Sequence, residues 1–150
     1  MANTEFTVRP AVISDIPEIV NNMLPAGIED CQRTGLHPVL SIGSDMRYSD
    51  TYVAVNSDDK IVTLFGFMDN IFWMHMTNEV TKEPFKFLKY AKRWFTANAK
   101  QPILCSMIDI HNTGLLKMAK SFGFKVVNVV PSGLNNTYYL QIVRLCHTQP

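Results

Sequence analysis

Residues 111–125, HNTGLLKMAKSFGFK, decide the fold that this sequence predicts. They follow a nearly continuous apolar run over 103–110 and precede a second apolar run over 126–130. Asn112 is a favourable N-cap, because its side-chain oxygen can accept a hydrogen bond from a free amide of the first helical turn. Gly123 suits the left-handed residue just past a helix C-terminus. The pattern therefore predicts a buried strand, a short helix and a new strand.

Length and composition set the outer limits of the interpretation. The chain has 150 residues, 47% of them hydrophobic, which predicts one domain over 1–150 with a substantial core. No apolar run approaches the ~20 residues of a membrane span, and the first residues lack the layout of a signal peptide. The net charge of +1 argues against a nucleic-acid binder. The three cysteines show no metal-ligand spacing, so we expect reduced thiols in a cytoplasmic protein and no metal site.

Outward from the deciding stretch, turn residues and hydrophobic periodicity predict the remaining elements. The expected strands cover 6–9, 51–55, 61–68, 71–76, 103–110, 126–130 and 137–145, with a turn at 131–136. The expected helices cover 15–24, opened by Ser14 or Asp15, then 26–33, 84–97 and the helix after Asn112, while 36–50 is expected to be irregular. Strands 71–76 and 103–110 should be parallel neighbours joined by helix 84–97 in a right-handed crossover.

The helix expected over 84–97 has two distinct faces. Its expected apolar face consists of Phe85, Leu88, Ala91, Trp94 and Phe95. Its basic stripe consists of Lys82, Lys86, Lys89 and Arg93. The stripe is either the solvated side of an amphipathic helix or a docking surface for an acidic partner or for cofactor phosphates.

The element order and the spacing from Asn112 to Gly123-Phe124 resemble the Gcn5-related N-acetyltransferase (GNAT) superfamily over nearly the whole chain. Val8-Arg9-Pro10 followed by Asp15 is similar to the first strand and helix of that family. The chain also resembles the small GNAT-like proteins that tailed phages encode. The resemblance implies an α/β (α+β) fold: a mixed, mostly antiparallel sheet with a central parallel β-α-β pair and helices on both faces.

The same resemblance implies acetyl-CoA as cofactor. Its pantetheine arm would enter a gap between strands 71–76 and 103–110 and pair with the backbone of the first strand. Its pyrophosphate would sit on the amides that open the following helix, where unpaired N–H groups and the helix dipole favour an anion. The cofactor contacts implied in this way are Met76, Thr77, Asn78, Thr81, Lys82, Glu83, Phe85, Lys86 and Asn112.

The segment 78–85 departs from the family pattern, which is an Arg/Gln-x-x-Gly-x-Gly/Ala loop. It contains no glycine, Pro84 removes one amide donor, and Glu83 would repel a phosphate. Lys82 and Lys86 could compensate by contacting phosphate directly. Two interpretations stay open: the segment is only a favourable helix start, or it retains CoA binding.

Four side chains are candidates for the base that deprotonates an acceptor amine: His75, Glu79, Asp109 and His111. An imidazole with a pKa of ~6.5 suits this task at neutral pH. His75 lies on a strand that would border the gap, where it could instead be a packing partner of Trp73. Asp109 and His111 lie at a strand end, where the sites of open sheets gather, but they could equally serve helix capping and solvation. Glu79 could be an exposed loop carboxylate.

Ala119 stands where family members often carry a Tyr that protonates the departing thiolate. A thiol with a pKa of ~8.5 can leave unaided, and the loss of an acid costs ~10²–10⁴ in rate. Cys105 lies inside an apolar strand and is not expected to be a nucleophile.

Two functions follow from the sequence and the resemblance. The first is an acetyl-CoA-dependent N-acyltransferase that acts on an amine of a small molecule or protein. The alternative is a non-catalytic GNAT-fold binding protein, such as a phage protein that engages a host enzyme or virion component. We expect an amine substrate or a protein partner, and neither nucleic acid nor membrane. The acceptor and the oligomeric state cannot be predicted from the sequence.

Overall fold

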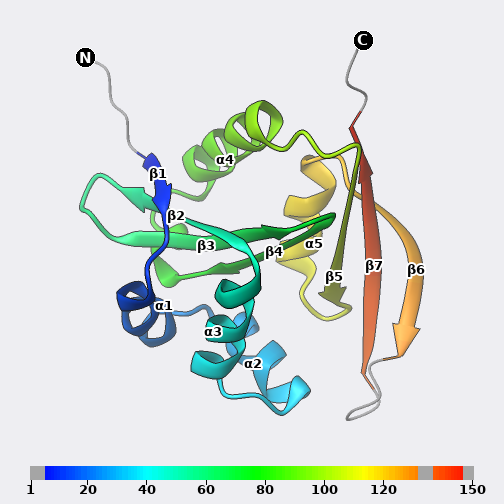
Figure 1. Cartoon of the computed structure of the whole chain (residues 1–150), viewed down its shortest axis with the longest axis horizontal. Helices are drawn as coiled ribbons and strands as arrows, with labels where there is room; N and C mark the ends of the chain where they lie inside the picture. Colours follow the sequence, from blue (N-terminus) through cyan, green and yellow to red (C-terminus); the bar gives the residue numbers. More distant parts are fainter. Residues whose placement is uncertain (1–5, 132–136, 147–150) are drawn as a thin grey trace.

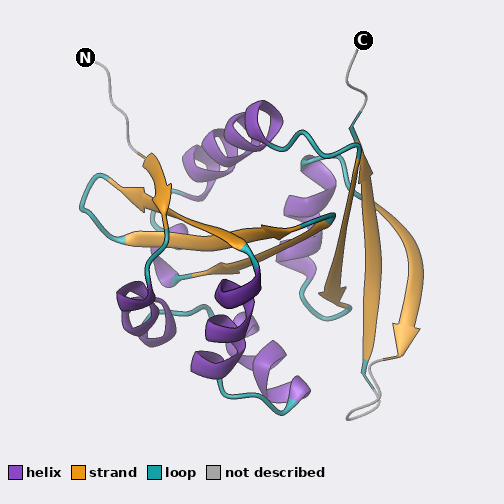
Figure 2. Cartoon of the chain, in the orientation of Figure 1, coloured by secondary structure: helices purple, strands orange, loops and turns teal. Residues whose placement is uncertain are grey.

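The computed structural model describes residues 6–131 and 137–146, and its centre is one seven-stranded sheet (Figures 1 and 2). The spatial order is β1-β2-β3-β4-β5-β7-β6. The strands are β1 Phe6–Pro10, β2 Asp50–Asn56, β3 Ile61–Met68, β4 Ile71–Met76, β5 Ile103–Asp109, β6 Lys125–Pro131 and β7 Tyr138–Leu145. Neighbours are antiparallel except for β4 and β5, which are parallel. The predicted sheet and its central parallel pair are confirmed. Of the turn expected over 131–136, Pro131 is the last residue of β6 and the remainder lies outside the described residues.

Helices cover both faces of the sheet, as predicted. Helices α1 Ile16–Asn21, α2 Pro25–Thr34 and α3 Pro38–Tyr48 lie on one side, and α4 Pro84–Asn98 and α5 Thr113–Ser121 on the other (Figure 1). Two short 3-10 turns, η1 Ile13–Asp15 and η2 Asn78–Thr81, precede α1 and α4. None of the helices in the described parts of the chain combines the length and the hydropathy that a membrane span requires.

Each face has its own hydrophobic core. On the α1–α3 side, Ile19 and Ile42 pack against strand residues such as Leu64. On the α4–α5 side the core is aromatic: Phe95 of α4 lies 5.0 Å from Phe122 between ring centroids. Such ring pairs add stability beyond their buried area, so they fix both helices against the sheet.

The deciding stretch folds as the sequence predicts. The Asn112 side chain accepts a hydrogen bond from Leu115 N–H at 3.3 Å, which caps α5. Gly123 has φ +99°, in the left-handed region that favours glycine. The expected position of the first helix is less accurate, because Asp15 does not cap α1 with its side chain. Its carboxylate instead pairs with Arg9 and accepts from Val12 N–H.

The prediction of an irregular segment over 36–50 is wrong, because most of it forms α3. His37 caps this helix by accepting a hydrogen bond from Val39 N–H at 3.2 Å, and Pro38 occupies its first turn. Only Ile42 of α3 is fully buried, so the apolar stripe that marks a helix in a sequence is thin here.

Two burial predictions are also wrong. Phe85 does not belong to the apolar face of α4, since 85% of it is exposed, and Phe87 is buried instead. The second concerns β5, which was expected to be buried on both faces. Leu104 and Ile108 are buried while Ile103 and Met107 are about half exposed, so one face of this strand is open.

Candidate functional site

The parallel strands β4 and β5 touch at one end and then diverge (Figure 1). Ile71 opposite Cys105 is their one register pair, next to a hydrogen bond of 2.7 Å from Cys105 N–H to the Asn70 carbonyl. On their other edges, β4 pairs with β3 and β5 pairs with β7 over their full lengths. The sheet therefore splits between β4 and β5, and we call this opening the splay.

The β4 backbone offers hydrogen-bonding groups to the splay. Thr77 N–H donates to the Val62 carbonyl at 2.9 Å on the β3 side. Because the backbone groups of successive strand residues point to opposite edges, those of Met74 and Met76 point into the splay. The Met76 carbonyl accepts from Leu24 N–H at 3.1 Å. Beyond Ile71, β4 has no strand partner on this edge within the described residues, so Met74 N–H, Met74 C=O and Met76 N–H are available to a ligand.

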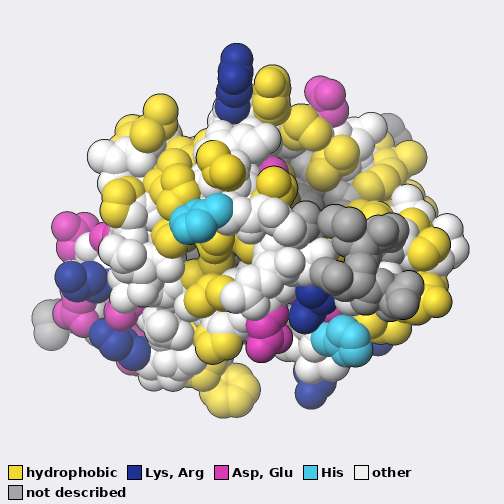
Figure 3. All heavy atoms as spheres, turned by 90° about the horizontal axis from the view of Figure 1, so that it is seen from below, with side chains coloured by type: hydrophobic (Ala, Val, Ile, Leu, Met, Phe, Trp, Pro, Cys, Tyr) yellow, Lys and Arg dark blue, Asp and Glu magenta, His cyan; other side chains and the backbone are white. Residues whose placement is uncertain are grey.

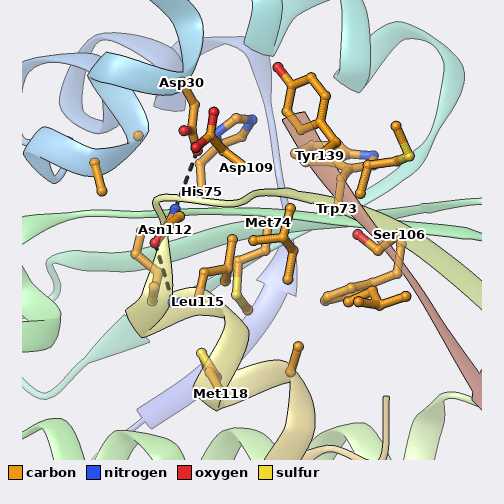
Figure 4. Close-up of a pocket in the computed structure, with 18 of the residues that line it drawn as sticks. Asp30, Trp73, Met74, His75, Ser106, Asp109, Asn112, Leu115, Met118 and Tyr139 are labelled. Carbon is orange, nitrogen blue, oxygen red and sulfur yellow. Dashed lines mark hydrogen bonds between the residues drawn. The ribbon is translucent and has the colours of Figure 1, made fainter. Parts of the chain in front are cut away.

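A cavity of about 220 Å³ occupies the splay and has two kinds of wall. On the α5 side its wall is apolar, with Met74, Leu115, Met118, Ala119 and Phe122. On the α2–α3 side its wall is polar, with Asp30, Asp45, His75, Asp109 and Tyr139. Figure 4 shows Asp30, Asp109 and His75 gathered on one side of the cavity and Leu115 and Met118 on the other. The cavity thus joins an apolar channel to an acidic chamber.

An ion-pair network ties α2 across the splay to β5 and α5. Arg33 Nε donates to Asp109 Oδ2 at 2.6 Å, and Arg33 Nη2 lies 3.3 Å from Asp30 Oδ1. Asp30 Oδ2 also accepts from the side-chain amide of Asn112 at 3.3 Å (Figure 4). The Asp109 carboxylate is fully buried and also accepts from His111 N–H at 2.8 Å. These bonds fix the Asp109 carboxylate in the polar wall of the cavity.

Burial shifts the protonation of two groups in the chamber. It raises the pKa of Asp30, against the opposing effect of the hydrogen bond from Asn112. It also raises the pKa of the Tyr139 hydroxyl, and the charges of Asp109 and Asp30 act in the same direction. Tyr139 therefore keeps its proton at neutral pH, and a cation near Asp30 would stabilise that carboxylate.

His75 lies on the polar wall with a carboxylate beside it. Its Nε2 is 3.5 Å from Asp45 Oδ2, and its ring centroid is 5.6 Å from that of Trp73. The Trp73 indole N–H donates to Ser49 Oγ at 2.8 Å. Its ring lies so close to Gly66 that a Cβ there would be 2.5 Å from Trp73 Cζ2. Gly66 thus makes room for the ring that supports His75.

The helix-entry loop, residues 77–83, is closed by its own hydrogen bonds. Besides Thr77 N–H, its amides at four further positions already donate within the protein. These bonds are Asn78 N–H to Asn22 O at 2.7 Å, Glu79 N–H to Thr77 Oγ1 at 3.2 Å, Val80 N–H to Thr77 O at 3.2 Å, and Lys82 N–H to Glu79 O at 3.2 Å. Two lysines pair with neighbouring carboxylates: Lys82 Nζ with Glu79 at 2.9 Å and Lys86 Nζ with Glu83 at 3.4 Å. The loop therefore offers a diphosphate few free donors.

The structure brings together some of the sequence-predicted site residues and separates others. His75, Met76, Asp109 and Asn112 line the cavity, while His111 and Glu79 are not among its lining residues. His111 is exposed. Glu79 accepts from Asn56 Nδ2 at 2.9 Å, and Lys82 lowers its pKa.

The predicted contacts Thr77, Asn78, Thr81, Lys82, Glu83, Phe85 and Lys86 belong to the helix-entry loop or the start of α4 and do not line the cavity. The Thr77 hydroxyl is buried and donates to the Ile61 carbonyl at 2.7 Å. The roles of all these residues stay predictions.

The sequence analysis missed Asp30 and Asp45, which line the chamber, and Arg33, which pairs with Asp109. Asp45 lies in α3, and the His37-Pro38 start with Ile42 and Met46 one turn apart was the signal that could have revealed this helix. Asp30 and Arg33 meet β5 from about 80 positions away in the sequence, which no local pattern shows. Seen from below in Figure 3, acidic and basic side chains form two groups, one at the left edge and one at the lower right with a histidine, while a second histidine lies among hydrophobic side chains.

Comparisons with known proteins define the fold. No protein-family model matches the sequence, and no curated protein matches it. The structure is similar to a spermidine N-acetyltransferase from Vibrio cholerae in complex with CoA and spermine, with TM-score 0.68 and 11% identity over 95% of this chain and 96% of that one. It is also similar to a GCN5-related N-acetyltransferase from Kribbella flavida, with TM-score 0.68 and 16% identity over 95% of this chain and 98% of that one. The chain therefore has the GNAT fold, as the sequence predicts.

Proposed function

We propose that this chain is an N-acyltransferase that takes its acyl group from a pantetheine thioester held in the splay. Acetyl-CoA is the donor that the GNAT resemblance implies. The observation that carries the proposal is the unpaired edge of β4, at Met74 and Met76, beside a cavity that leads to an acidic chamber with a histidine. The splay residues fit the amide groups and the narrow chain of a pantetheine arm. The helix-entry loop fits a diphosphate less well, because the amides of Asn78, Glu79, Val80 and Lys82 donate within the protein and Pro84 has no amide hydrogen.

The residues of the acidic chamber suit a cationic amine as acceptor. Asp30 and Asp45 attract the ammonium form, and the rings of Trp73 and Tyr139 offer surfaces that also favour a cation. The ammonium form first loses one proton to solvent, His75 accepts the second proton as the nitrogen bonds to the acyl carbon, and Asp45 orients the imidazole. The bound thioester supplies the carbonyl carbon to which the amine nitrogen bonds while the carbon–sulfur bond breaks. Ala119 donates no proton, so the departing thiolate takes its proton from solvent.

An assay of thiol release in the presence of amines tests the proposal. We expect the purified protein to release thiol from acetyl-CoA or S-acetylpantetheine only when an amine such as spermidine or a lysine peptide is added. His75→Ala should lower this rate by ~10²–10⁴. A larger loss in His111→Ala than in His75→Ala would assign the base to the strand end instead. Absence of amine-dependent release at saturating donor would contradict the proposal.

A non-catalytic binding protein is the second candidate function. The closed helix-entry loop and the methyl group of Ala119 in place of a phenol favour it, because both remove groups that aid transfer. Calorimetric titration separates the candidates: binding of acetyl-CoA or S-acetylpantetheine supports the enzyme, and no binding of either at millimolar ligand supports the binding protein. The narrower resemblance to phage proteins, with a host enzyme or virion component as partner, stays a prediction, as does the cytoplasmic location.

A further inference from the structure

The two parts of the proposed donor site, the splay and the helix-entry loop, differ in how many backbone groups they leave free. The splay leaves backbone groups of β4 free for a pantetheine arm, whereas five amides of the helix-entry loop donate within the protein. A pantetheine arm occurs in cells on two kinds of molecule. In CoA it is joined to a diphosphate, which the protein must also bind. On a carrier protein it is joined through a phosphodiester to an acidic protein surface, and both would stay outside the splay. A chain with an open splay and few free amides in the helix-entry loop fits a carrier protein better than CoA as donor.

The start of α4 presents a basic surface at the open end of the splay. β4 leads through η2 directly into α4, so this surface borders the end at which β4 and β5 lie apart (Figure 1). Residues 82–100 contain six Lys or Arg and a single carboxylate, Glu83. The basic stripe lies along this segment with all four of its members exposed: Lys82 and Lys86, which pair with Glu79 and Glu83, and Lys89 and Arg93. This surface is complementary to an acidic protein.

An exposed aromatic residue lies within the same surface. Phe85 is 85% exposed, although the helix on which it lies buries Phe87 and Phe95. A large aromatic side chain surrounded by charged residues is typical of the anchor of a protein interface. Lys82, Lys86 and Lys89 lie one turn before it, beside it and one turn after it. Neither the fold nor the proposed transfer step explains this exposure.

We propose that the first turns of α4, from Lys82 to Arg93, dock an acidic carrier protein whose acylated phosphopantetheine arm enters the splay. The inference rests on the proposed pantetheine site and names its donor. In the transfer, the amine nitrogen forms a bond to the acyl carbon and the carbon–sulfur bond of the arm breaks. The amine loses one proton to His75, and the carrier protein leaves as a thiolate that takes a proton from solvent.

Calorimetric titration with four probes tests the docking. The probes are an acidic bacterial acyl carrier protein with an acetylated arm, the same protein without its arm, CoA, and pantetheine. We expect the acetylated carrier protein to bind at least about tenfold more tightly than the armless form and more tightly than CoA. CoA and pantetheine should differ by less than about threefold. Raising the salt concentration from about 0.05 M to about 0.5 M should weaken the binding of the carrier protein much more than the binding of pantetheine.

A charge-reversal pair supplies the matched control. The double variant Lys89→Glu with Arg93→Glu should lower the affinity for the carrier protein at least about tenfold relative to the affinity for pantetheine. Lys117→Glu with Lys120→Glu on α5 reverses the same number of charges and should leave this ratio within about twofold. Equal effects of the two pairs, equal binding of the armed and armless proteins, or CoA at least about tenfold tighter than pantetheine would each overturn the docking proposal. Tight binding of the armed protein without transfer to any amine would support docking and contradict the N-acyltransferase proposal, so the two failures are distinguishable.

Discussion

The splay and the helix-entry loop are adjacent in the sequence, yet the structure leaves one open and closes the other. The splay opens because β4 pairs fully with β3 and β5 pairs fully with β7, while the two strands share one register pair. This opening depends on sheet topology, which many sequences can adopt. A phosphate cradle instead needs free amides and residues without bulky side chains, whereas five amides of the helix-entry loop donate within the protein and the loop contains no glycine. A fold can therefore provide an opening for the arm of a cofactor although its sequence lacks the groups that bind the phosphates.

Filling the splay should have the largest effect. Ser106 lies on β5 and lines the cavity. In Ser106→Trp the indole would occupy the space of the pantetheine arm, and we expect the affinity for pantetheine to fall at least about 100-fold, or about 2.7 kcal/mol. Titration calorimetry measures the loss, and the melting temperature confirms folding. Ser57→Trp in the exposed β2–β3 turn is the matched control. Unchanged binding in Ser106→Trp would place the ligand outside the splay.

The network at the mouth of the chamber should give the next largest effect. Asp109→Asn removes the charge from a buried hydrogen bond of 2.6 Å with Arg33. We expect the free energy of unfolding to fall by about 2 kcal/mol, because a hydrogen bond between charged groups loses strength. Denaturant titration measures it. Asp58→Asn in an exposed turn serves as control and should change stability by less than about 0.5 kcal/mol. Equal effects would show that the network does not hold α2 in place.

Alanine substitutions of two glycines should change the stability of the protein in opposite directions, and so test the packing around Trp73 and α3. In Gly66→Ala the new methyl group would meet the Trp73 ring, so we expect a loss of about 1–2 kcal/mol. Gly43 lies inside α3 with no atom within 4 Å of an added Cβ, and Gly43→Ala should stabilise the protein by up to about 1 kcal/mol. Thermal or denaturant unfolding compares the two. A destabilised Gly43→Ala variant beside a neutral Gly66→Ala would contradict the described packing.

The smallest effect concerns the pH dependence of stability. Burial raises the pKa of Asp30 in the folded state, so the ionised carboxylate disfavours folding at neutral pH. Asp30→Asn should therefore increase stability at pH 7 by less than about 1 kcal/mol, and this gain should vanish as the pH falls through the raised pKa. Asp15 is the control of opposite sign, because its hydrogen bond from Arg9 lowers its pKa. Asp15→Asn should cost stability at pH 7, and the cost should shrink as the pH falls through the lowered pKa. A gain from Asp30→Asn that is the same at every pH would contradict the burial of this charge.

The sequence predicted the sheet more reliably than the site because each depends on a different range of interaction. β4, α4, β5 and α5 carry apolar periodicity and caps such as Asn112, which are local signals. The helix α3 was missed because only Ile42 is fully buried on it. The buried face of α4 is rotated relative to the expected one, so that Phe87 is buried and Phe85 is exposed.

The acidic chamber could not be predicted because tertiary packing assembles it. Asp30 and Asp45 reach the splay from two helices that precede β4. Their chemistry is visible in the sequence, but their proximity to His75 arises only when α2 and α3 lie over the sheet. The absence of glycine from the helix-entry loop, by contrast, is visible from the sequence alone, and the structure adds that five of its amides donate within the protein.

Backbone amide NMR shifts during separate titrations with pantetheine and CoA test the contrast between the splay and the helix-entry loop most directly. The account predicts that the amides of Met74 and Met76 shift with both ligands. It also predicts that the amides of Asn78, Val80 and Lys82 stay in place even with CoA, because they donate within the protein. Shifts of the loop amides with CoA but not with pantetheine, or an unperturbed β4 with both ligands, would contradict it.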